Sequence, residues 1–76
     1  MRKYFEKQDP AGKQHRYYSI RVSQTLFSDW AMIREWGRIG QRGTVRETWY
    51  DTEADALAAR QKLAAQKQRR GYHARP

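Results

Sequence analysis

Cysteine is absent from this sequence of 76 residues, and proline and histidine occur only twice each. Without cysteine the chain can form neither a disulfide framework nor a thiolate zinc site. A domain of this length buries only about 60% of the surface that its unfolded chain exposes, so its core must be small. We therefore expect the three tryptophans, five tyrosines and two phenylalanines to supply much of the apolar burial.

Long apolar segments are also missing. No apolar run approaches the length of a membrane span, and the N-terminal residues lack the apolar stretch of a signal peptide. Internal repeats and low-complexity segments are absent as well. The sequence predicts one cytoplasmic domain over residues 1–76, with no membrane partner.

The residue types used in catalysis and metal binding form no recognisable motif. His15 and His73 are far apart in the sequence, and we expect them near opposite ends of the fold. Neither has a carboxylate at a metal-motif spacing, and no serine lies in a nucleophile-elbow context. Residues 37–43 lack the lysine of a Walker loop and do not open a helix. The sequence therefore predicts no enzyme, no catalytic residue, no metal site and no cofactor.

Positive charge is what the sequence has in excess. Sixteen lysines and arginines against eight acidic residues give a net charge of +8, and the isoelectric point is about 10.3. The excess is spread along the chain and is not confined to a tail. A folded domain with this charge points toward a polyanion, with nucleic acid ahead of an acidic membrane. A basic domain without such a partner is the alternative.

Four segments have the character of β-strands. Residues 2–8 are typical of an edge strand, because their lysines discourage pairing with another sheet. Proline and glycine at positions 9–12 then predict a turn. In residues 17–23, alternation places Tyr18, Ile20 and Val22 on one face. Residues 24–29 form a connection whose apolar pair, Leu26 and Phe27, can tuck under the sheet.

The third and fourth strands are expected at residues 30–36 and 44–50. Regular alternation puts Trp36 on the same face as Trp30 and Met32, which favours a core position for its indole. A bulge at residues 34–35 would instead turn Trp36 outward, and bulges are common next to functional sites. Both possibilities are open at this point. The mixed charges of residues 44–50 indicate one solvated face.

A helix follows these strands. The sequence Thr52-Glu53-Ala54-Asp55 resembles a capping box, so that Asp51 or Thr52 is the N-cap. Good helix formers continue to Arg70, and Gly71 fits the position after the C-cap. The helix stripe is formed by Ala56, Ala59 and Leu63, continues at Gln66 or Lys67, and is widened by Leu57 and Ala64. The basic run at residues 67–70 is more typical of a solvated helix end than of a binding site. The sum is an α+β fold, a small antiparallel β-sheet of about four strands packed with one C-terminal α-helix.

Residues 36–43 are the most distinctive stretch of the chain. They combine one tryptophan, three glycines and two arginines directly after an apolar run. Glycine lets a backbone or a ligand approach closely, an arginine fork suits phosphate, and an indole can stack on a base. This pattern is typical of a loop that presents Trp36, Arg38 and Arg42 to an anion carrying a flat group. A tight hairpin with solvated charges would share many of these features.

The same residues resemble the signature of the WGR domain family, which is named for the tripeptide at Trp36, Gly37 and Arg38. The resemblance extends over roughly residues 3–73. It includes the family's aromatic strand at residues 16–20, its acidic helix start and Ala-rich helix at residues 52–65, and its closing segment at residues 67–72.

Members of this family occur in DNA-damage-dependent poly(ADP-ribose) polymerases and as short stand-alone bacterial proteins. In the polymerases the domain reads DNA breaks and contacts the duplex end near its 5′ terminus. The resemblance implies that Trp36 packs on a terminal sugar or base and that Arg38 contacts a DNA phosphate or a neighbouring domain. The full set of DNA-binding residues that we expect is Trp36, Gly37, Arg38, Arg42, Arg16, His15, Lys13 and Tyr72.

Two functions follow from this sequence. The first is a small nucleic-acid-binding module, with DNA as the expected partner, that recognises phosphates and ends or strand breaks. Base specificity should be poor because no segment resembles a recognition helix, and affinity should fall steeply with salt. The alternative is a protein–protein interaction module that docks a partner through the surface of Trp36, Gly37 and Arg38. The polymerase catalytic, zinc-finger and regulatory domains have no counterpart in this sequence, so interdomain signalling is not implied.

Overall fold

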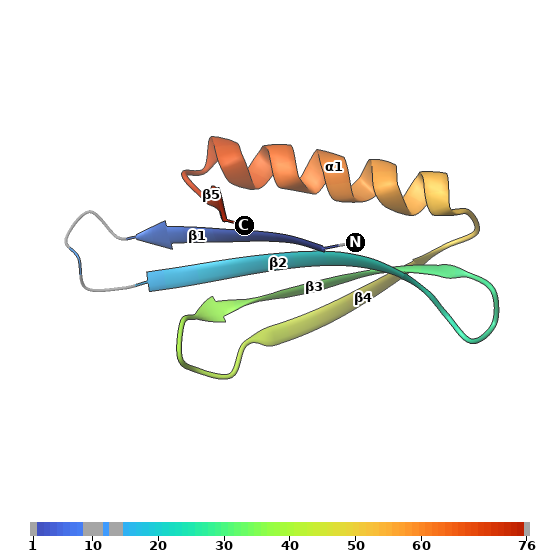
Figure 1. The fold of residues 1–76 in the computed structure, drawn as a ribbon, viewed down its shortest axis with the longest axis horizontal. Coiled ribbons are helices and arrows are strands. Elements are labelled where there is room, and N and C mark those ends of the chain that lie inside the picture. Colours follow the sequence, from blue (N-terminus) through green and yellow to red (C-terminus); the bar gives the residue numbers. More distant parts are fainter. Residues whose placement is uncertain (1, 9–11, 13–14, 76) are drawn as a thin grey trace.

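The computed structural model describes residues 2–8, 12 and 15–75. An antiparallel sheet in the strand order β4-β3-β2-β1-β5 carries one helix, α1, across one of its faces (Figure 1). We call this side the helix face and the other side the open face. The elements in chain order are β1 (Arg2–Gln8), β2 (His15–Gln24), β3 (Trp30–Arg38), β4 (Thr44–Tyr50), α1 (Glu53–Arg69) and β5 (His73–Arg75).

The core lies between the sheet and the helix. Alternation along β2 directs Tyr18, Ile20 and Val22 to the helix face, as predicted. Small residues on α1 let the helix approach the sheet closely, and Ala56 and Ala64 are buried there. The buried apolar cluster consists of Phe5, Tyr18, Ile20, Val22, Met32, Ala56 and Ala64.

The sheet has a strand that the sequence did not indicate. The chain turns back after α1, and β5 pairs antiparallel with β1 through Glu6 and His73. The three residues of β5 are too few to show an alternating pattern of their own. The predicted strands β1 and β4 have the expected bounds, whereas β2 and β3 each extend beyond the predicted segment.

Strand β3 is regular throughout. Its pairing with both β2 and β4 continues without interruption through Arg34 and Glu35, so no bulge turns Trp36 outward. Trp36 therefore shares the helix face with Trp30 and Met32. It is half-buried and packs against the core.

The β2–β3 connection is exposed, contrary to expectation. Leu26 is 99% exposed and Phe27 is 77% exposed, so this pair does not tuck under the sheet. A tight turn explains the difference, because the backbone N–H of Thr25 donates to the carbonyl oxygen of Asp29 and Ser28 has a positive φ of 72°. A loop this short cannot reach back beneath the sheet that it closes. The other expected turn, at residues 9–12, lies outside the described residues except for Gly12.

The ends of α1 match their sequence signals. Thr52 is the N-cap and accepts a hydrogen bond from the backbone N–H of Asp55. At the other end Gly71 has a φ of 95°, and the N–H of Tyr72 donates to the carbonyl oxygen of Lys67. The sequence did not indicate that Arg60 is buried, but it lies between Ala56 and Ala64 on the buried side of the helix. In the described ranges, no helix has the length and apolar character needed to span a bilayer.

The open face carries a hydrogen-bonded tyrosine that can be titrated. The hydroxyl of Tyr17 donates to Oε2 of Glu35 at 2.9 Å. Burial raises the pKa of Tyr17 above its usual 10.0, and the hydrogen bond and negative charge of Glu35 raise it further. Because the folded pKa is the higher one, this stabilisation is present below pH 10 and is lost as the pH rises through the folded pKa.

We expect a phenolate titration of the wild type, minus that of a Tyr17→Phe variant, to have its midpoint above pH 10.0. Glu35→Gln should move this midpoint down, because the amide keeps an acceptor but removes the charge. The absorbance of the phenolate measures the midpoint in the wild type and in the variant. If Glu35→Gln leaves the midpoint unchanged, Glu35 does not act on the Tyr17 hydroxyl.

Candidate nucleic-acid interface

Three aromatic rings meet where β2, β3 and the end of α1 come together. Tyr18 and Trp36 are direct cross-strand partners, and their rings are stacked with centroids 5.6 Å apart and planes 11° apart. Tyr72, placed by the turn after α1, meets Tyr18 edge-on at 6.0 Å. Stacked and edge-to-face pairs of this kind add stability beyond simple area burial. The two strands and the helix end are thereby joined at one point.

Cationic side chains cover these rings. The Lys67 ammonium lies 4.4 Å from the centroid of Tyr18, and the Arg34 guanidinium lies 5.6 Å from that of Trp36. The Lys7 ammonium lies 5.6 Å from the centroid of Tyr72. Each distance is within the range of a cation–π interaction. We call the group of Tyr18, Trp36, Tyr72, Lys7, Arg34 and Lys67 the aromatic–cation cluster.

A row of three positive residues crosses the sheet next to the aromatic rings and shares Lys7 with this cluster. Lys7 on β1 is the register partner of Arg16 on β2, and Arg16 is the partner of Arg38 on β3. Direct partners in antiparallel strands lie on the same face, here the helix face. Like charges in this position are destabilising. We call these three residues the cation row.

Burial and the neighbouring positive charges both act on the ammonium of Lys67. Burial lowers the pKa of Lys67 below its usual 10.5, and the charges of Arg70, Arg34 and Lys7 lower it further. The protonated ammonium is thus less favourable in the fold than in the unfolded chain. A bound anion would instead favour the protonated ammonium.

The β3–β4 hairpin holds the glycines of the signature. The N–H of Gln41 donates to the carbonyl oxygen of Arg38 at 3.1 Å, and Gly40 takes the positive φ of 89° that this turn requires. A methyl group on Gly43 would collide with the Tyr17 hydroxyl and with the carbonyl oxygen of Trp36. Glycine at position 43 thus leaves room for the side chain of Tyr17 and the backbone of Trp36. The sequence had suggested that this room is for a ligand.

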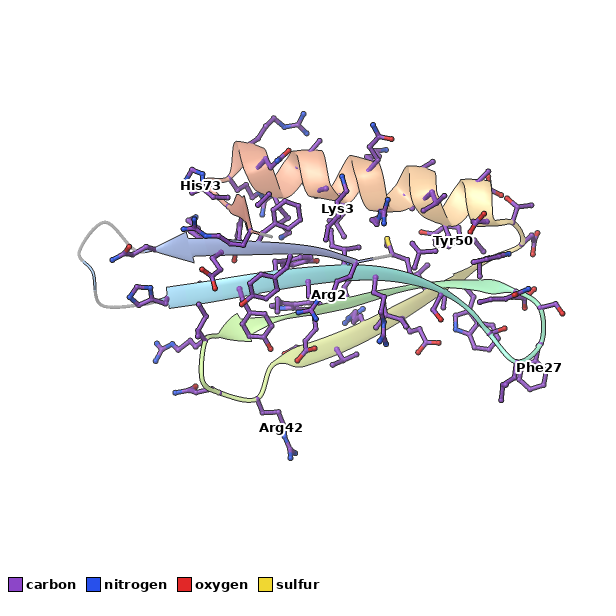
Figure 2. The ribbon with its side chains drawn as sticks, in the orientation of Figure 1. Arg2, Lys3, Phe27, Arg42, Tyr50 and His73 are labelled. Atoms are coloured by element: carbon purple, nitrogen blue, oxygen red, sulfur yellow. The ribbon has the colours of Figure 1, made fainter. Side chains whose placement is uncertain are left out.

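The structure gathers half of the predicted site residues. Trp36, Arg38 and Arg16 share the helix face, and Tyr72 joins them through Tyr18. The side chain of Arg42 extends away from the hairpin (Figure 2). His15 and Gly37 are on strands of the same sheet, but alternation assigns them to the open face. Lys13 lies outside the described residues.

The two histidines are close together, which corrects the expectation that they lie at opposite ends. Strand β1 lies between them, because Gln8 is the partner of His15 and Glu6 is the partner of His73. Both line one polar cavity of about 230 Å³. The unexpected strand β5 is the reason, since it returns the C-terminal segment to the end of the sheet where β2 begins.

Sequence reasoning missed several members of the cluster. The sequence assigned Lys7 to the protection of an edge strand and residue 34 only to a possible bulge. The basic run at residues 67–70 indicated a solvated helix end, although Lys67 also continues the helix stripe. In the structure Lys67 is half-buried and its ammonium lies over Tyr18. The available signal was the alternation of side chains along a strand. Lys7 is two residues from Phe5, and Arg34 is two residues from Trp36, so each lies on the same face as that aromatic residue.

The family model described as WGR domain matches residues 1–76, so the chain belongs to the WGR domain family. It is also similar to the uncharacterized protein y4dW of Sinorhizobium fredii (strain NBRC 101917 / NGR234). The two are 39% identical over 75 residues, which cover 99% of this chain and 37% of that protein. The chain thus spans little more than a third of this relative. No solved structure matches the chain.

We expect a low concentration of sulfate to raise the midpoint of thermal unfolding at constant ionic strength. An anion that binds the folded state at ten times its Kd stabilises by about 1.4 kcal/mol. In a domain of this size one kcal/mol shifts the midpoint by roughly 4–8 °C. Lys67→Met should reduce the shift, because it keeps the apolar stem and removes the charge at the cluster.

Lys62→Met is the matched control for this experiment, since Lys62 is on the same helix and exposed. Its variant should keep the full sulfate effect. Equal losses in both variants would show that sulfate acts through overall charge and not through the cluster.

Proposed function

We propose that this chain binds DNA at the end of the helix face, through the cation row and the aromatic–cation cluster. WGR domains are generally nucleic-acid-binding modules, which supports a nucleic-acid partner. The observation that carries the proposal is the cation row itself. It gathers three positive residues on one face of three neighbouring strands, where a polyanion can contact all of them.

The proposed roles follow from position. Lys7, Arg16 and Arg38 lie across three neighbouring strands and can each meet a phosphate of one backbone. Strand spacing of about 4.8 Å is shorter than the spacing between phosphates, so long side chains must splay to follow the backbone. Arginine forks suit this role because they bind phosphate with two parallel hydrogen bonds.

Trp36 has a more limited role than a free stacking platform. Its ring is already engaged by Tyr18 and Arg34, and the side chain is half-buried. It offers a fixed apolar surface on which a terminal sugar or base can pack, with Tyr72 close by. A nucleotide inside a duplex has both ring faces covered by its neighbours, whereas a terminal one has one face open. This favours recognition of an end, and the cation row favours an end with a 5′ phosphate.

The module is proposed to act by binding and not by catalysis, and to have little base specificity. Its contacts would be made mostly to phosphate and sugar, which carry no sequence information directly. A second candidate is a protein partner that docks on the Trp36, Gly37 and Arg38 surface. The length of the Sinorhizobium relative favours it, because in that protein the matched region is joined to a longer polypeptide.

The test is an anisotropy titration of a short blunt duplex, with and without a 5′ phosphate, at two salt concentrations. We expect the 5′ phosphate to increase affinity. Arg38→Ala should weaken binding by about 10- to 100-fold, the range for a hydrogen bond to a charged group. It should also reduce the salt slope by about 1.

Arg21→Ala is the matched control. It removes the same charge from an exposed arginine of β2 that lies on the open face. Its affinity should stay near that of the wild type. If both variants weaken binding equally, the positive charge acts without a defined site. If closed circles compete as well as linear ends, end recognition is wrong, and weak binding that ignores salt would favour the protein partner.

A further inference from the structure

The sheet has one long free edge. Strands β4 and β5 are the two edges, and β4 has seven residues whereas β5 has three. All residues of β4 except Tyr50 are exposed, and no described residue pairs with its outer side. Unpaired N–H and C=O groups along such an edge are a template for another strand. Lysine and proline, which often protect edges, do not occur in β4.

An exposed apolar patch lies against this edge on the open face. Phe27 and Trp49 are in ring contact, with centroids 6.3 Å apart, although they are 77% and 50% exposed. Together with Leu26 and Ile33 they line a groove of about 240 Å³. The patch is at the end of the molecule opposite His73, so it is separate from the candidate nucleic-acid interface (Figure 2). Single exposed apolar residues are ordinary, but a contiguous patch marks an interaction site.

We propose that a second copy of this chain covers the edge and the Trp49 side of the patch, through antiparallel pairing of β4 with the partner's β4. A two-fold axis perpendicular to the sheet generates this pairing and places one residue of β4 opposite its own copy. The proposal goes beyond nucleic-acid binding and does not depend on it.

Among the registers centred on the three middle residues of β4, 46–48, the sequence favours one. Centring the pair on Arg46 or on Glu47 would place two like charges directly opposite each other, which is destabilising. Centring it on Thr48 removes both conflicts. Arg46 then lies opposite the partner's Tyr50, and Glu47 lies opposite the partner's Trp49. Glu47 already accepts a hydrogen bond from the Trp49 indole within one copy, at 2.6 Å, so this combination is chemically compatible.

Charge complementarity also favours a second copy. The end of the domain near Phe27 carries five of the eight acidic residues, at positions 29, 47, 51, 53 and 55. The hairpin at the other end of β4 carries Arg42. Antiparallel pairing brings the acidic end of each copy beside the basic hairpin of the other. Although each chain has a net charge of +8, two chains can thus associate along β4, where acidic groups of one copy lie beside basic groups of the other.

Cysteine crosslinking tests the proposal directly, because the chain has no cysteine of its own. A residue on the two-fold axis faces its own copy at a Cα separation that a disulfide can bridge. We expect Thr48→Cys to form a disulfide-linked dimer under mild oxidation. Arg46→Cys and Glu47→Cys should crosslink several-fold less, and they are matched controls on the same exposed strand.

Sedimentation equilibrium supplies the second measurement. The apparent mass of the wild type should rise from 9.1 kDa to twice that value with increasing concentration. Trp49→Glu should stay monomeric, because it removes the indole and places a carboxylate opposite the partner's Glu47. Thr48→Lys should stay monomeric because it places two lysines opposite each other. Circular dichroism verifies that each variant folds. If one variant does not fold, the other still tests the proposal.

Two results would overturn the proposal. A wild type that stays monomeric, without a Thr48→Cys crosslink, shows that β4 does not pair with a second copy. Stronger crosslinking at position 46 or 47 shows that the register is wrong.

Discussion

The stack of Tyr18 on Trp36 is the contact on which the rest of the interface depends. It fixes the register between β2 and β3, because the two residues are direct partners across the strands. That register in turn sets Arg16 opposite Arg38 and Lys7 opposite Arg16. Through Tyr72 and Lys67 the same rings receive the end of α1. A slip of one residue would move every one of these side chains to the other face.

The domain separates its charges along its length. Cations gather where α1 ends and β2 begins, and the acidic residues are concentrated where α1 begins. At the cationic end, aromatic rings make cation–π contacts with Lys7, Arg34 and Lys67. Burial lowers the pKa of Lys67 there. Like charges gathered in this way repel one another, and a bound anion would relieve that repulsion.

Local patterns were sufficient for most of the fold. Alternation placed Tyr18, Ile20 and Val22, and capping signals located both ends of α1, because these features depend on residues near in sequence. The failures were nonlocal. Strand β5 exists because the chain returns beside β1, and the cation row exists because three strands meet in one register. Neither can be read from a single segment. The exposure of Leu26 and Phe27 also escaped prediction, since apolar character alone does not show what covers a side chain.

The most direct test of the proposed interface is to observe the three tryptophan side chains during DNA binding. Trp30, Trp36 and Trp49 each contribute one indole N–H signal to a ¹H–¹⁵N spectrum, and single Trp→Phe variants assign them. Addition of a short 5′-phosphorylated duplex should shift the Trp36 signal and leave the Trp49 signal in place. A shift confined to Trp49, on the open face, would contradict the account.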